Sequence, residues 1–531
     1  MAQRAMGIGR GAALIAGLTL LSRMLGLVRT LVFSQTIGSG CLGTSYVTAY
    51  QVPNLISELV LGGALTSAMV PVLARMAERA EADPEERARV GQITSSLLTW
   101  AVVILVPVTA VMMAVAQPVA SLLIPSNANS HCVRADMVAT SGGMLETFAP
   151  QVLLYGISVV LFGLLQAYRR FTAPALAPVV ASAVLIVSYL AFVPLDDKAP
   201  LRATPLSAKV VLYGGTTLSI GVLALVAVPA VWRLHLRFRP SLMLPRDLAR
   251  FTGGMAAVGV AEFIANDLGS VVIITLANGR GDTGALVLFN YAWLAFNAVY
   301  GVLALSIVTS AFPVMSARDG DAFDRTVAGS TRAVVLLSWL GTAVMVAVAL
   351  PASRILVQQP SQVHELVQGF VTFAPGVVGF AVVTNLSRAM FVMRRLTIAG
   401  VALTGSWLLV MAADAILAFL VPAHLVVGAL GLGSTLGQTL AAIPTVIVTR
   451  RICGKPAVAG VGRAMIAGVI AGALGAAMGL AVASAVPAGR KFEDAGTAVL
   501  AAVCALVAFA VIAYALDRED MQTVLRRVIR R

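Results

Sequence analysis

Two arginines, Arg23 and Arg29, lie in an otherwise apolar or small-residue stretch from Gly11 to Gly38 that is long enough to cross a bilayer. An arginine at the centre of a spanning helix costs on the order of 3 kcal/mol, so such residues usually face a wet cavity or a partner. Their six-residue spacing gives a rise of about 9 Å and an angular offset of about 120° on an α-helix. The pair could therefore hold an elongated anion such as a pyrophosphate at two heights, because guanidinium groups bind phosphate oxygens bidentately.

A structural alternative exists for both arginines. Arg23 could pair with an acidic residue, either Glu58 or Glu146, while the side chain of Arg29 reaches toward the outer interface. Two arginines on one helix exceed what a single structural ion pair needs, so we favour the binding interpretation.

Acidic residues within the predicted spans form a second group of side chains that could take part in the function. Glu262 and Asp267 share one span, and Asp414 lies in a later one. Acids that face a cavity could bind a proton or Na⁺ and couple transport to an ion gradient or to the membrane potential. The alternative is that each acid hydrogen-bonds to a neighbouring helix. We predict no cofactor and no metal site, since the four histidines are scattered without metal-ligand spacing.

The elements that must position these residues are membrane helices. Hydrophobic residues make up 59% of the 531 positions and charged residues only 12%, a composition that excludes a soluble protein of this length. Apolar windows of about 20 residues recur along the chain and predict an all-α polytopic membrane protein with about 14 transmembrane helices. The predicted spans are 11–37, 46–74, 93–116, 137–167, 174–195, 210–232, 252–278, 283–315, 331–352, 366–393, 397–421, 425–449, 459–486 and 496–516.

The distribution of basic residues predicts the orientation of the chain. Of the 38 Lys and Arg residues, 27 fall on the side of the N-terminus, 8 on the opposite side and 3 within spans. The positive-inside rule then places both termini in the cytoplasm. The net charge of +14 follows from this topology and from contact with anionic membrane lipids, so we do not expect a nucleic-acid partner.

An internal repeat divides the spans into halves. The stretch Ala149–Val152 is followed, 19 residues after its proline, by Arg169–Thr172, and Ala374–Val377 is followed at the same spacing by Arg394–Thr397. The two matches lie in the fourth and tenth spans, which run in the same direction. They predict two parallel-related six-helix lobes with a pseudo-two-fold axis along the membrane normal. The expected divisions are an N-lobe over 1–240, a C-lobe over 241–452, and two C-terminal helices with a cytoplasmic tail over 453–531.

The four cysteines, Cys41, Cys132, Cys453 and Cys504, show no C-x-x-C spacing, which argues against a zinc site or a redox motif. We interpret them as isolated thiols. A bridge between Cys41 and Cys132, which are both predicted on the outer side, is the alternative hypothesis.

Several motifs along the chain carry a family resemblance. The stretches SRMLGLVRT, TIGSG, QVPNL and GGALTSAMVPVLAR, followed by APQVLLYG, NYAWL and SAFPVMS, closely resemble the MurJ (MviN) family. That family comprises lipid II flippases of the multidrug/oligosaccharidyl-lipid/polysaccharide exporter superfamily. The Ala-rich composition and the preference for Arg over Lys in this chain resemble an actinobacterial branch of it.

The resemblance implies a function. It implies fourteen helices around a central cationic cavity, and transfer of the undecaprenyl-pyrophosphate-linked peptidoglycan precursor between leaflets of the bacterial plasma membrane. Such a protein is a transporter rather than an enzyme, and other cell-wall synthesis proteins are expected partners. The resemblance assigns substrate contact to Arg23 and Arg29. Asn54 of the P-N-L motif and the nearby Glu58 are further substrate-binding candidates.

The chain departs from the family pattern in three places where many members carry charged residues. Ser45 stands where many members carry an acid, Ser57 and Glu58 where they carry a basic pair, and Trp293 and Leu294 where they carry Asp-Arg. Arg23 and Arg29 are then the main cationic pair, and the departures leave the identity of the lipid-linked substrate open. The alternatives are a flippase for another lipid-linked glycan and a transport-silent scaffold for cell-wall synthesis.

Overall fold

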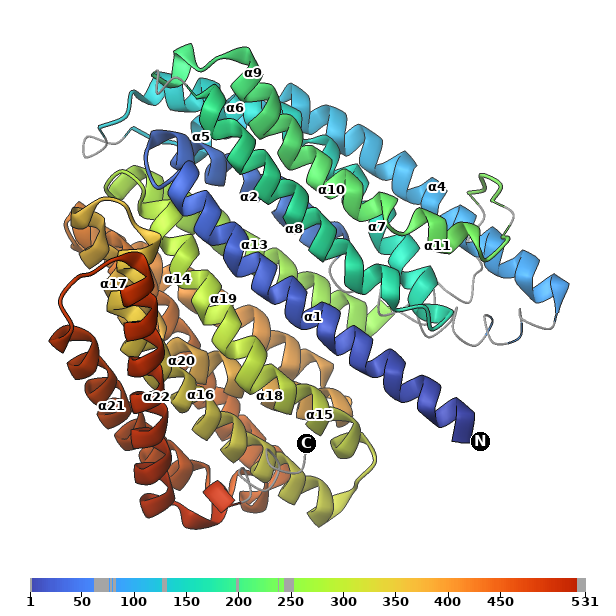
Figure 1. Ribbon diagram of the computed structural model, residues 1–531. Helices are drawn as coiled ribbons and strands as arrows, with labels where there is room; N and C mark the ends of the chain where they lie inside the picture. The colour runs from blue at the N-terminus through green and yellow to red at the C-terminus, as the bar shows by residue number, and fades with distance from the viewer. Residues whose placement is uncertain are drawn as a thin grey trace. The chain divides into compact units, whose positions relative to one another are not determined.

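The chain is described here by a computed structural model, shown in Figure 1. The described residues are 2–61, 76, 79, 83–126, 131–196, 200–236, 238–242 and 253–522. Within them all regular structure is helical, and 13 helical segments are long and apolar enough to cross a membrane. The predicted all-α polytopic fold is confirmed. The predicted span over 46–74 is described only as far as residue 61, so its second half lies outside the described residues.

The chain divides into two compact units. Unit 1 comprises residues 1–125 and 132–263, and unit 2 comprises residues 126–131 and 264–531. The division of the chain at 240 and 452 stays a prediction. The α-helices that begin in unit 1 are α1 (Ala2–Thr36), α2 (Cys41–Leu61), α4 (Pro84–Ala114), α5 (Ala116–Leu123), α6 (Arg134–Phe148), α7 (Pro150–Ala167), α8 (Thr172–Phe192), α9 (Leu206–Lys209), α10 (Gly215–Leu225), α11 (Val228–Trp232) and α13 (Gly253–Arg280).

The helices of unit 2 continue from α13, whose second part belongs to this unit. They are α14 (Ala285–Val299), α15 (Leu305–Ser316), α16 (Gly320–Leu356), α17 (Pro360–Phe373), α18 (Gly376–Val392), α19 (Leu396–Leu420), α20 (Val426–Cys453), α21 (Val461–Ala485) and α22 (Lys491–Leu516). Short π-helical segments interrupt both units, at η3 (Val210–Gly214) and η4 (Tyr300–Ala304), and the 3-10 turns are η1 (Val193–Leu195), η2 (Leu201–Ala203), η5 (Ala423–Leu425) and η6 (Lys455–Val458).

The internal repeat is also a repeat of backbone geometry. α7 and α18 each begin at or just after the proline of the matched motif, and the residue after each C-cap is an arginine in the left-handed conformation, Arg169 at φ 56° and Arg394 at φ 58°. The next residue closes the turn in both halves: the N–H of Arg170 donates to the Leu165 carbonyl at 2.8 Å, and that of Arg395 to the Met390 carbonyl at 2.9 Å. This is the Schellman ending of a helix, which glycine usually provides.

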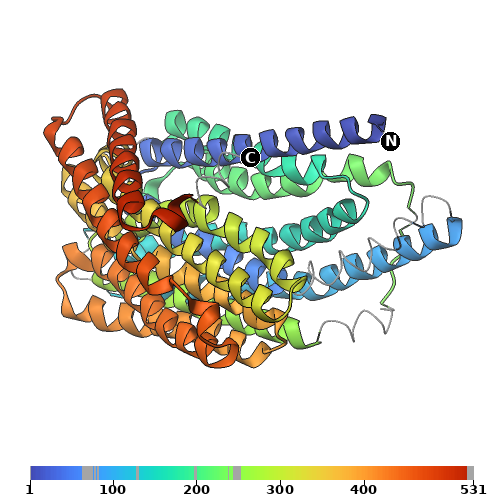
Figure 2. The ribbon, with the colours of Figure 1, turned by 90° about the horizontal axis from the view of Figure 1, so that it is seen from below.

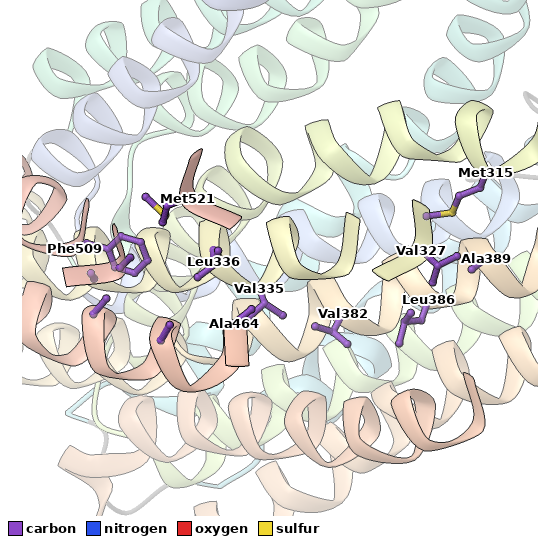
Figure 3. Close-up of a cluster of buried hydrophobic side chains, with 14 of the residues drawn as sticks. Met315, Val327, Val335, Leu336, Val382, Leu386, Ala389, Ala464, Phe509 and Met521 are labelled. Carbon is purple, nitrogen blue, oxygen red and sulfur yellow. The ribbon is translucent and has the colours of Figure 1, made fainter. Parts of the chain in front are cut away.

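In unit 2, α16 packs against the C-terminal helix pair α21 and α22. Figure 3 shows buried side chains from α15, α16, α18, α21 and α22 in one apolar cluster, including Val335, Leu386 and Phe509. Gly468 and Gly472 of α21 lie against the indole of Trp339 in α16. Small residues let helix backbones approach closely in a bilayer, where the hydrophobic effect does not drive helices together.

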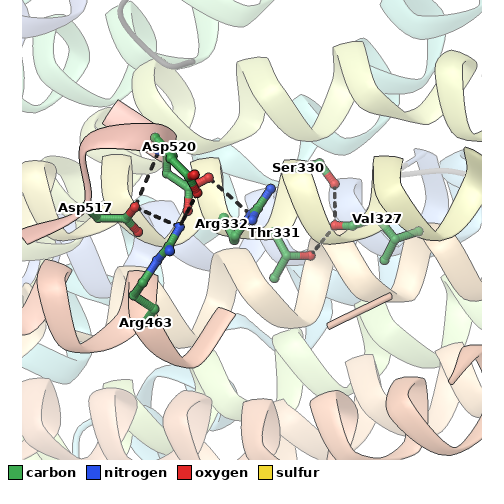
Figure 4. Close-up of polar contacts among 8 residues, drawn as sticks. Val327, Ser330, Thr331, Arg332, Arg463, Asp517 and Asp520 are labelled. Atoms are coloured by element: carbon green, nitrogen blue, oxygen red, sulfur yellow. Dashed lines mark hydrogen bonds and ion pairs between the residues drawn. The ribbon is translucent and has the colours of Figure 1, made fainter. Parts of the chain in front are cut away.

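Ion pairs join residues near both ends of α22 to the neighbouring helices α16 and α21. Figure 4 shows Arg463 of α21 directed at Asp517 and Asp520, with N–O distances of 3.0 and 3.6 Å. Arg332 of α16 reaches Asp520 at 3.3 Å. Burial raises the pKa of the Asp520 carboxyl above its usual value, against the lowering effect of Arg332. Near the other end of α22, Arg354 of α16 pairs with a buried aspartate, Asp494, at 3.5 Å.

Unit 1 contains a disulfide that overturns our interpretation of two of the cysteines. Cys41 and Cys132 are bridged, with their Cα atoms 5.8 Å apart, whereas Cys453 and Cys504 are free thiols. The isolated-thiol interpretation is therefore wrong for the first pair, and the alternative bridge is confirmed. The spacing of 91 residues carried no signal, because the pairing depends on α2 and α6 packing side by side.

Candidate functional site

The side chain of Arg29 lies on the packed face of α1. Arg29 precedes Phe33 by four residues, so both side chains project from one side of the helix. On that side the Phe33 ring contacts Tyr46 of α2, with centroids 5.4 Å apart, and Tyr189 of α8 at 5.5 Å. The hydroxyls of Tyr46 and Tyr189 are hydrogen-bonded to each other at 3.0 Å, and both residues are buried. This aromatic cluster holds Arg29 toward the interior of unit 1.

A second layer of polar side chains lies next to Arg29. Tyr46, Tyr50 and Asn54 follow one another at intervals of four residues and therefore share one face of α2. Tyr155 of α7 donates its hydroxyl hydrogen to Oδ1 of Asn54 at 3.2 Å. The guanidinium of Arg29 interacts electrostatically with the hydroxyls of Tyr50 and Tyr155. Arg29, Tyr50, Asn54 and Tyr155 are all partly exposed, and we call this group the Arg29 site.

The second arginine of α1 has different surroundings. Arg23 is exposed, in keeping with its offset of about 120° from Arg29 around the helix. Glu58 and Glu146, the candidate counter-ions, are exposed as well. Among the ion pairs that the structure describes, none joins either arginine to Glu58 or Glu146. The structure thus connects Arg29 and Asn54 through Tyr155, whereas Arg23 and Glu58 are exposed.

Most of the residues at which the sequence departs from the family pattern take part in packing or in hydrogen bonds within their own helix. Ser45 is fully buried beside α6, and the hydroxyl of Ser57 donates to the Pro53 carbonyl of its own helix at 2.6 Å. The ring of Trp293 stacks on a neighbouring aromatic ring at 5.1 Å, while Leu294 is 36% exposed. These residues contribute no charge.

Asp414 is the most deeply buried of the acidic candidates. It lies in α19 with no exposed surface and faces Gly433 of α20. A Cβ atom at position 433 would come within 2.7 Å of the Asp414 backbone nitrogen and 2.9 Å of its Cα, so only glycine fits there. Within the described part of the chain, neither carboxylate oxygen of Asp414 has a hydrogen-bond partner, and no ion pair includes this residue.

The other two acids lie in α13. Asp267 accepts a hydrogen bond from the amide of Asn266 at 3.4 Å and is partly buried. Glu262 is also partly buried, but it belongs to unit 1, whereas Asp267 and Asp414 belong to unit 2. The described residues contain no group of three His, Cys, Asp or Glu side chains that could hold a metal ion. The three acids therefore do not form one shared cluster within a unit.

Sequence reasoning did not identify the tyrosines. Tyr50 and Tyr155 belong to apolar spans, where an aromatic residue is most often part of the packing. The four-residue spacing of Tyr46, Tyr50 and Asn54 places them on one helix face, and this pattern could have identified the α2 part of the site. The partner Tyr155 is 101 residues from Asn54, and only the fold brings them together.

Comparison with known proteins identifies the family. The sequence model described as "Lipid II flippase MurJ" matches residues 33–516. The chain belongs to this family. The MurJ family is one of transporters, and the motifs at the N-terminal end of the chain resembled it for this reason.

Curated MurJ relatives are distant and longer than the matched region. The lipid II flippase MurJ of Burkholderia cenocepacia is 26% identical over 321 residues, which cover 60% of this chain and 58% of that protein. The probable lipid II flippase MurJ of Rhizobium meliloti is 24% identical over 327 residues, 59% of this chain and 55% of that protein. The chain thus spans little more than half the length of these MurJ relatives.

Solved structures show the same fold. A lipid II flippase MurJ in an inward closed conformation superposes with a TM-score of 0.72 and 14% identity, covering 94% of this chain and 99% of that one. An inward-facing MATE transporter of the MOP superfamily follows with a TM-score of 0.65 and 13% identity, covering 84% and 98%. At these identities the likeness concerns the MurJ fold alone.

Proposed function

We propose that this chain is a lipid II flippase. It moves the undecaprenyl-pyrophosphate-linked peptidoglycan precursor from the inner to the outer leaflet of a bacterial plasma membrane by alternating access, and it has no catalytic activity. Membership of the MurJ family supports this function. The observation that carries it is the Arg29 site, where a partly exposed guanidinium in a membrane helix is surrounded by hydroxyl and amide groups. Such a site suits an anionic head group.

The proposed topology has both termini in the cytoplasm. The excess of Lys and Arg on the N-terminal side supports it. The disulfide gives independent support, because disulfides persist in oxidising compartments. Cys41 begins α2, directly after α1 has crossed the membrane once. An outer position for Cys41 therefore puts the N-terminus inside.

The proposed energy source is an ion gradient or the membrane potential. Asp414 is the strongest candidate for binding a proton or Na⁺, because its carboxylate is fully buried in a membrane helix. Asp267 in the same unit and Glu262 are the weaker candidates. Exchange of Asp414 for asparagine should abolish ion-driven transport in vesicles while leaving substrate binding intact. Transport that keeps its dependence on the gradient in this variant would remove Asp414 from the coupling mechanism.

A flippase for another lipid-linked glycan is the second candidate function. It is favoured by the neutral residues Ser45, Ser57 and Leu294 at positions where the family pattern has charges. A membrane scaffold that recruits cell-wall synthesis proteins is the remaining alternative. The scaffold would have membrane lipids and other proteins as partners but would not need a substrate-binding arginine.

Complementation of a MurJ-depleted bacterium separates these functions. The variants are wild type, Arg29→Ala, Arg29→Lys and Arg23→Ala, each with its level in the membrane measured. A lipid II flippase should rescue growth as wild type and fail as Arg29→Ala, with partial rescue by Arg29→Lys because lysine keeps the charge without the bidentate fork. A glycan flippase should not rescue at all. Rescue by Arg29→Ala at normal membrane levels would leave the scaffold as the better description.

A further inference from the structure

Each unit contains a membrane span that is interrupted at an equivalent place by a proline. α6 and α7 together form one span of unit 1, and α17 and α18 form one span of unit 2. Pro150 and Pro375 lie at the two interruptions. A proline has no N–H, so it removes one hydrogen bond from the helix and weakens the helix at that point. Both prolines belong to the internal repeat, whose role the proposed function does not explain.

A threonine of a neighbouring helix holds the interruption in both units. In unit 1, the hydroxyl of Thr217 in α10 donates to the Thr147 carbonyl at 2.7 Å. In unit 2, the hydroxyl of Thr435 in α20 donates to the Thr372 carbonyl at 2.6 Å. Each accepting carbonyl lies three residues before the proline, so the two hydrogen bonds are equivalent in the repeat. Neighbouring Ser and Thr side chains can replace the hydrogen bonding that a proline takes away from a membrane helix.

The interruption in unit 2 is held at further points. Thr342 of α16 donates its hydroxyl hydrogen to the Ala374 carbonyl at 2.9 Å. Directly after the proline, a Cβ atom at Gly376 would come within 3.1 Å of the Thr435 Cα. About one turn later, Gly379 also lies directly against the backbone of α20. Both α16 and α20 therefore fix this interruption, and the start of α18 has no room to shift against α20.

The interruption in unit 1 is held more weakly. Gln151, which corresponds to Gly376, is fully buried, and its amino group donates to the Thr217 hydroxyl at 3.2 Å. Its Oε1 atom is buried without a hydrogen-bond partner in the described part of the chain, which lowers the stability of this arrangement. A Cβ atom at Gly221 of α10 would meet only Leu154 of α7, at an ordinary contact distance of 3.8 Å. α7 and α10 are therefore packed less tightly here than α18 and α20.

We propose that the interruption between α6 and α7 is a hinge of unit 1 during transport, with Thr217 as the residue that holds it, whereas the interruption between α17 and α18 is a fixed bend. The inference rests on the proposed function, because it assumes alternating access. A moving span needs a point that changes shape while the helices on either side stay rigid. α10, which carries Thr217, also follows directly on the π-helical segment η3, and π-helical turns are frequent at functional sites. Thr217 is thus a positioning residue.

Hydrogen–deuterium exchange of the full-length protein tests the difference between the two interruptions. The protein is purified in one detergent as wild type, Thr217→Val, Thr217→Ser and Thr435→Val. Exchange is followed by mass spectrometry over residues 147–153 and 372–378 and is corrected for the intrinsic rates of the two sequences. Valine keeps the shape of threonine but removes the hydroxyl, whereas serine keeps the hydroxyl.

Two further threonines provide matched controls. Thr94 in unit 1 and Thr445 in unit 2 are buried, and their hydroxyls bond to carbonyls of their own helices at 2.8 and 2.7 Å. Thr94→Val and Thr445→Val therefore remove a buried hydroxyl without touching an interruption. Both should leave exchange over residues 147–153 and 372–378 as in wild type. Exchange in the remaining helices reports whether any variant has lost its overall fold.

The expected exchange rates follow from the number of contacts that hold each interruption. Wild type should exchange roughly fivefold faster over residues 147–153 than over 372–378, since one hydrogen bond corresponds to about this factor in local opening. Thr217→Val should add about another fivefold over 147–153, and Thr217→Ser should restore the wild-type rate. Thr435→Val should change 372–378 by less than about twofold, because the bond from Thr342 and the glycine contacts remain. Equal wild-type rates, or no effect of Thr217→Val, would overturn the inference.

A bound ligand shows whether the hinge takes part in the transport cycle. Undecaprenyl pyrophosphate is added to wild type, and its binding is measured in the same detergent. Exchange over residues 147–153 should then change by at least about twofold, while exchange over 372–378 stays the same. Bound lipid without any change over 147–153 would mean that the interruption is static, and this result would also overturn the inference.

Failure of the inference can be distinguished from failure of the proposed function. If the two interruptions exchange equally while wild type rescues a MurJ-depleted bacterium, the hinge is refuted and lipid II transport still stands. If wild type neither rescues growth nor binds undecaprenyl pyrophosphate, but residues 147–153 exchange faster and depend on the Thr217 hydroxyl, the hinge is supported and the substrate is another lipid-linked compound.

Discussion

Replacing Gly379 by alanine should destabilise unit 2. Gly379 lies in α18, where a Cβ atom would come within 2.6 Å of the Gln438 carbonyl carbon and 2.8 Å of the Thr439 nitrogen in α20. Carbon atoms in contact prefer about 3.5–4.0 Å, so the two helices would have to separate by roughly 1 Å. These neighbours are backbone atoms, which cannot turn aside as a flexible side chain can. Overpacking of this kind costs about 1–3 kcal/mol of unfolding free energy.

The matched control is Gly405→Ala in the middle of α19, where an added Cβ would meet nothing within 4 Å. Alanine has a better helix propensity than glycine by about 1 kcal/mol, and this gain applies to both variants. The difference between the two variants therefore isolates the cost of the close contact at Gly379. Thermal unfolding of purified protein, followed by tryptophan fluorescence in one detergent, should rank Gly405→Ala at or above wild type and Gly379→Ala several degrees below the control. Equal midpoints for the two alanine variants would refute the reasoning.

Three further predictions concern other features of the fold. Arg394→Gly should raise the unfolding free energy by about 1 kcal/mol, because glycine adopts a positive φ without the steric cost that arginine incurs; a lower thermal midpoint would mean that the arginine side chain contributes more than this cost. Arg463→Gln should lower the midpoint more than Glu519→Gln, since Arg463 neutralises the buried Asp517 while the Glu519 side chain is 84% exposed; equal midpoints would show that the cluster adds no stability. Maleimide labelling of denatured protein should modify two cysteines before reduction and four after it; four labelled thiols without reductant would contradict the disulfide.

Hydropathy predicted most of the fold because the bilayer permits few alternatives. A span must satisfy its own backbone groups, so an apolar window of about 20 residues is almost always a helix. The breaks within spans were harder to predict. Ala149 separates α6 from α7, and Ala374 with Pro375 separates α17 from α18, although each pair forms one membrane span. The repeated proline marked both places, but the apolar pattern continues across them.

The candidate site was predicted only in part. Arg29 was identified because a charge in an apolar span is costly, and Asn54 because of its motif. Tyr155 was missed, since a tyrosine in an apolar span has no distinguishing cost and its partner is far away in the sequence. The disulfide was predicted only as an alternative to isolated thiols, because the pairing partner of Cys41 is also far away in the sequence. Both features depend on which helices lie side by side, and the order of residues along a membrane chain says little about that.

The cysteines give each unit its own chemical label. Cys41 and Cys132 are joined in unit 1, while Cys453 and Cys504 are free thiols in unit 2. A thiol-reactive probe added to the oxidised protein therefore reports on unit 2 alone. A second probe added after reduction reports on unit 1. The order of addition can place two different fluorophores on the two units of an unaltered chain, so that each unit can be followed separately without introducing a single substitution.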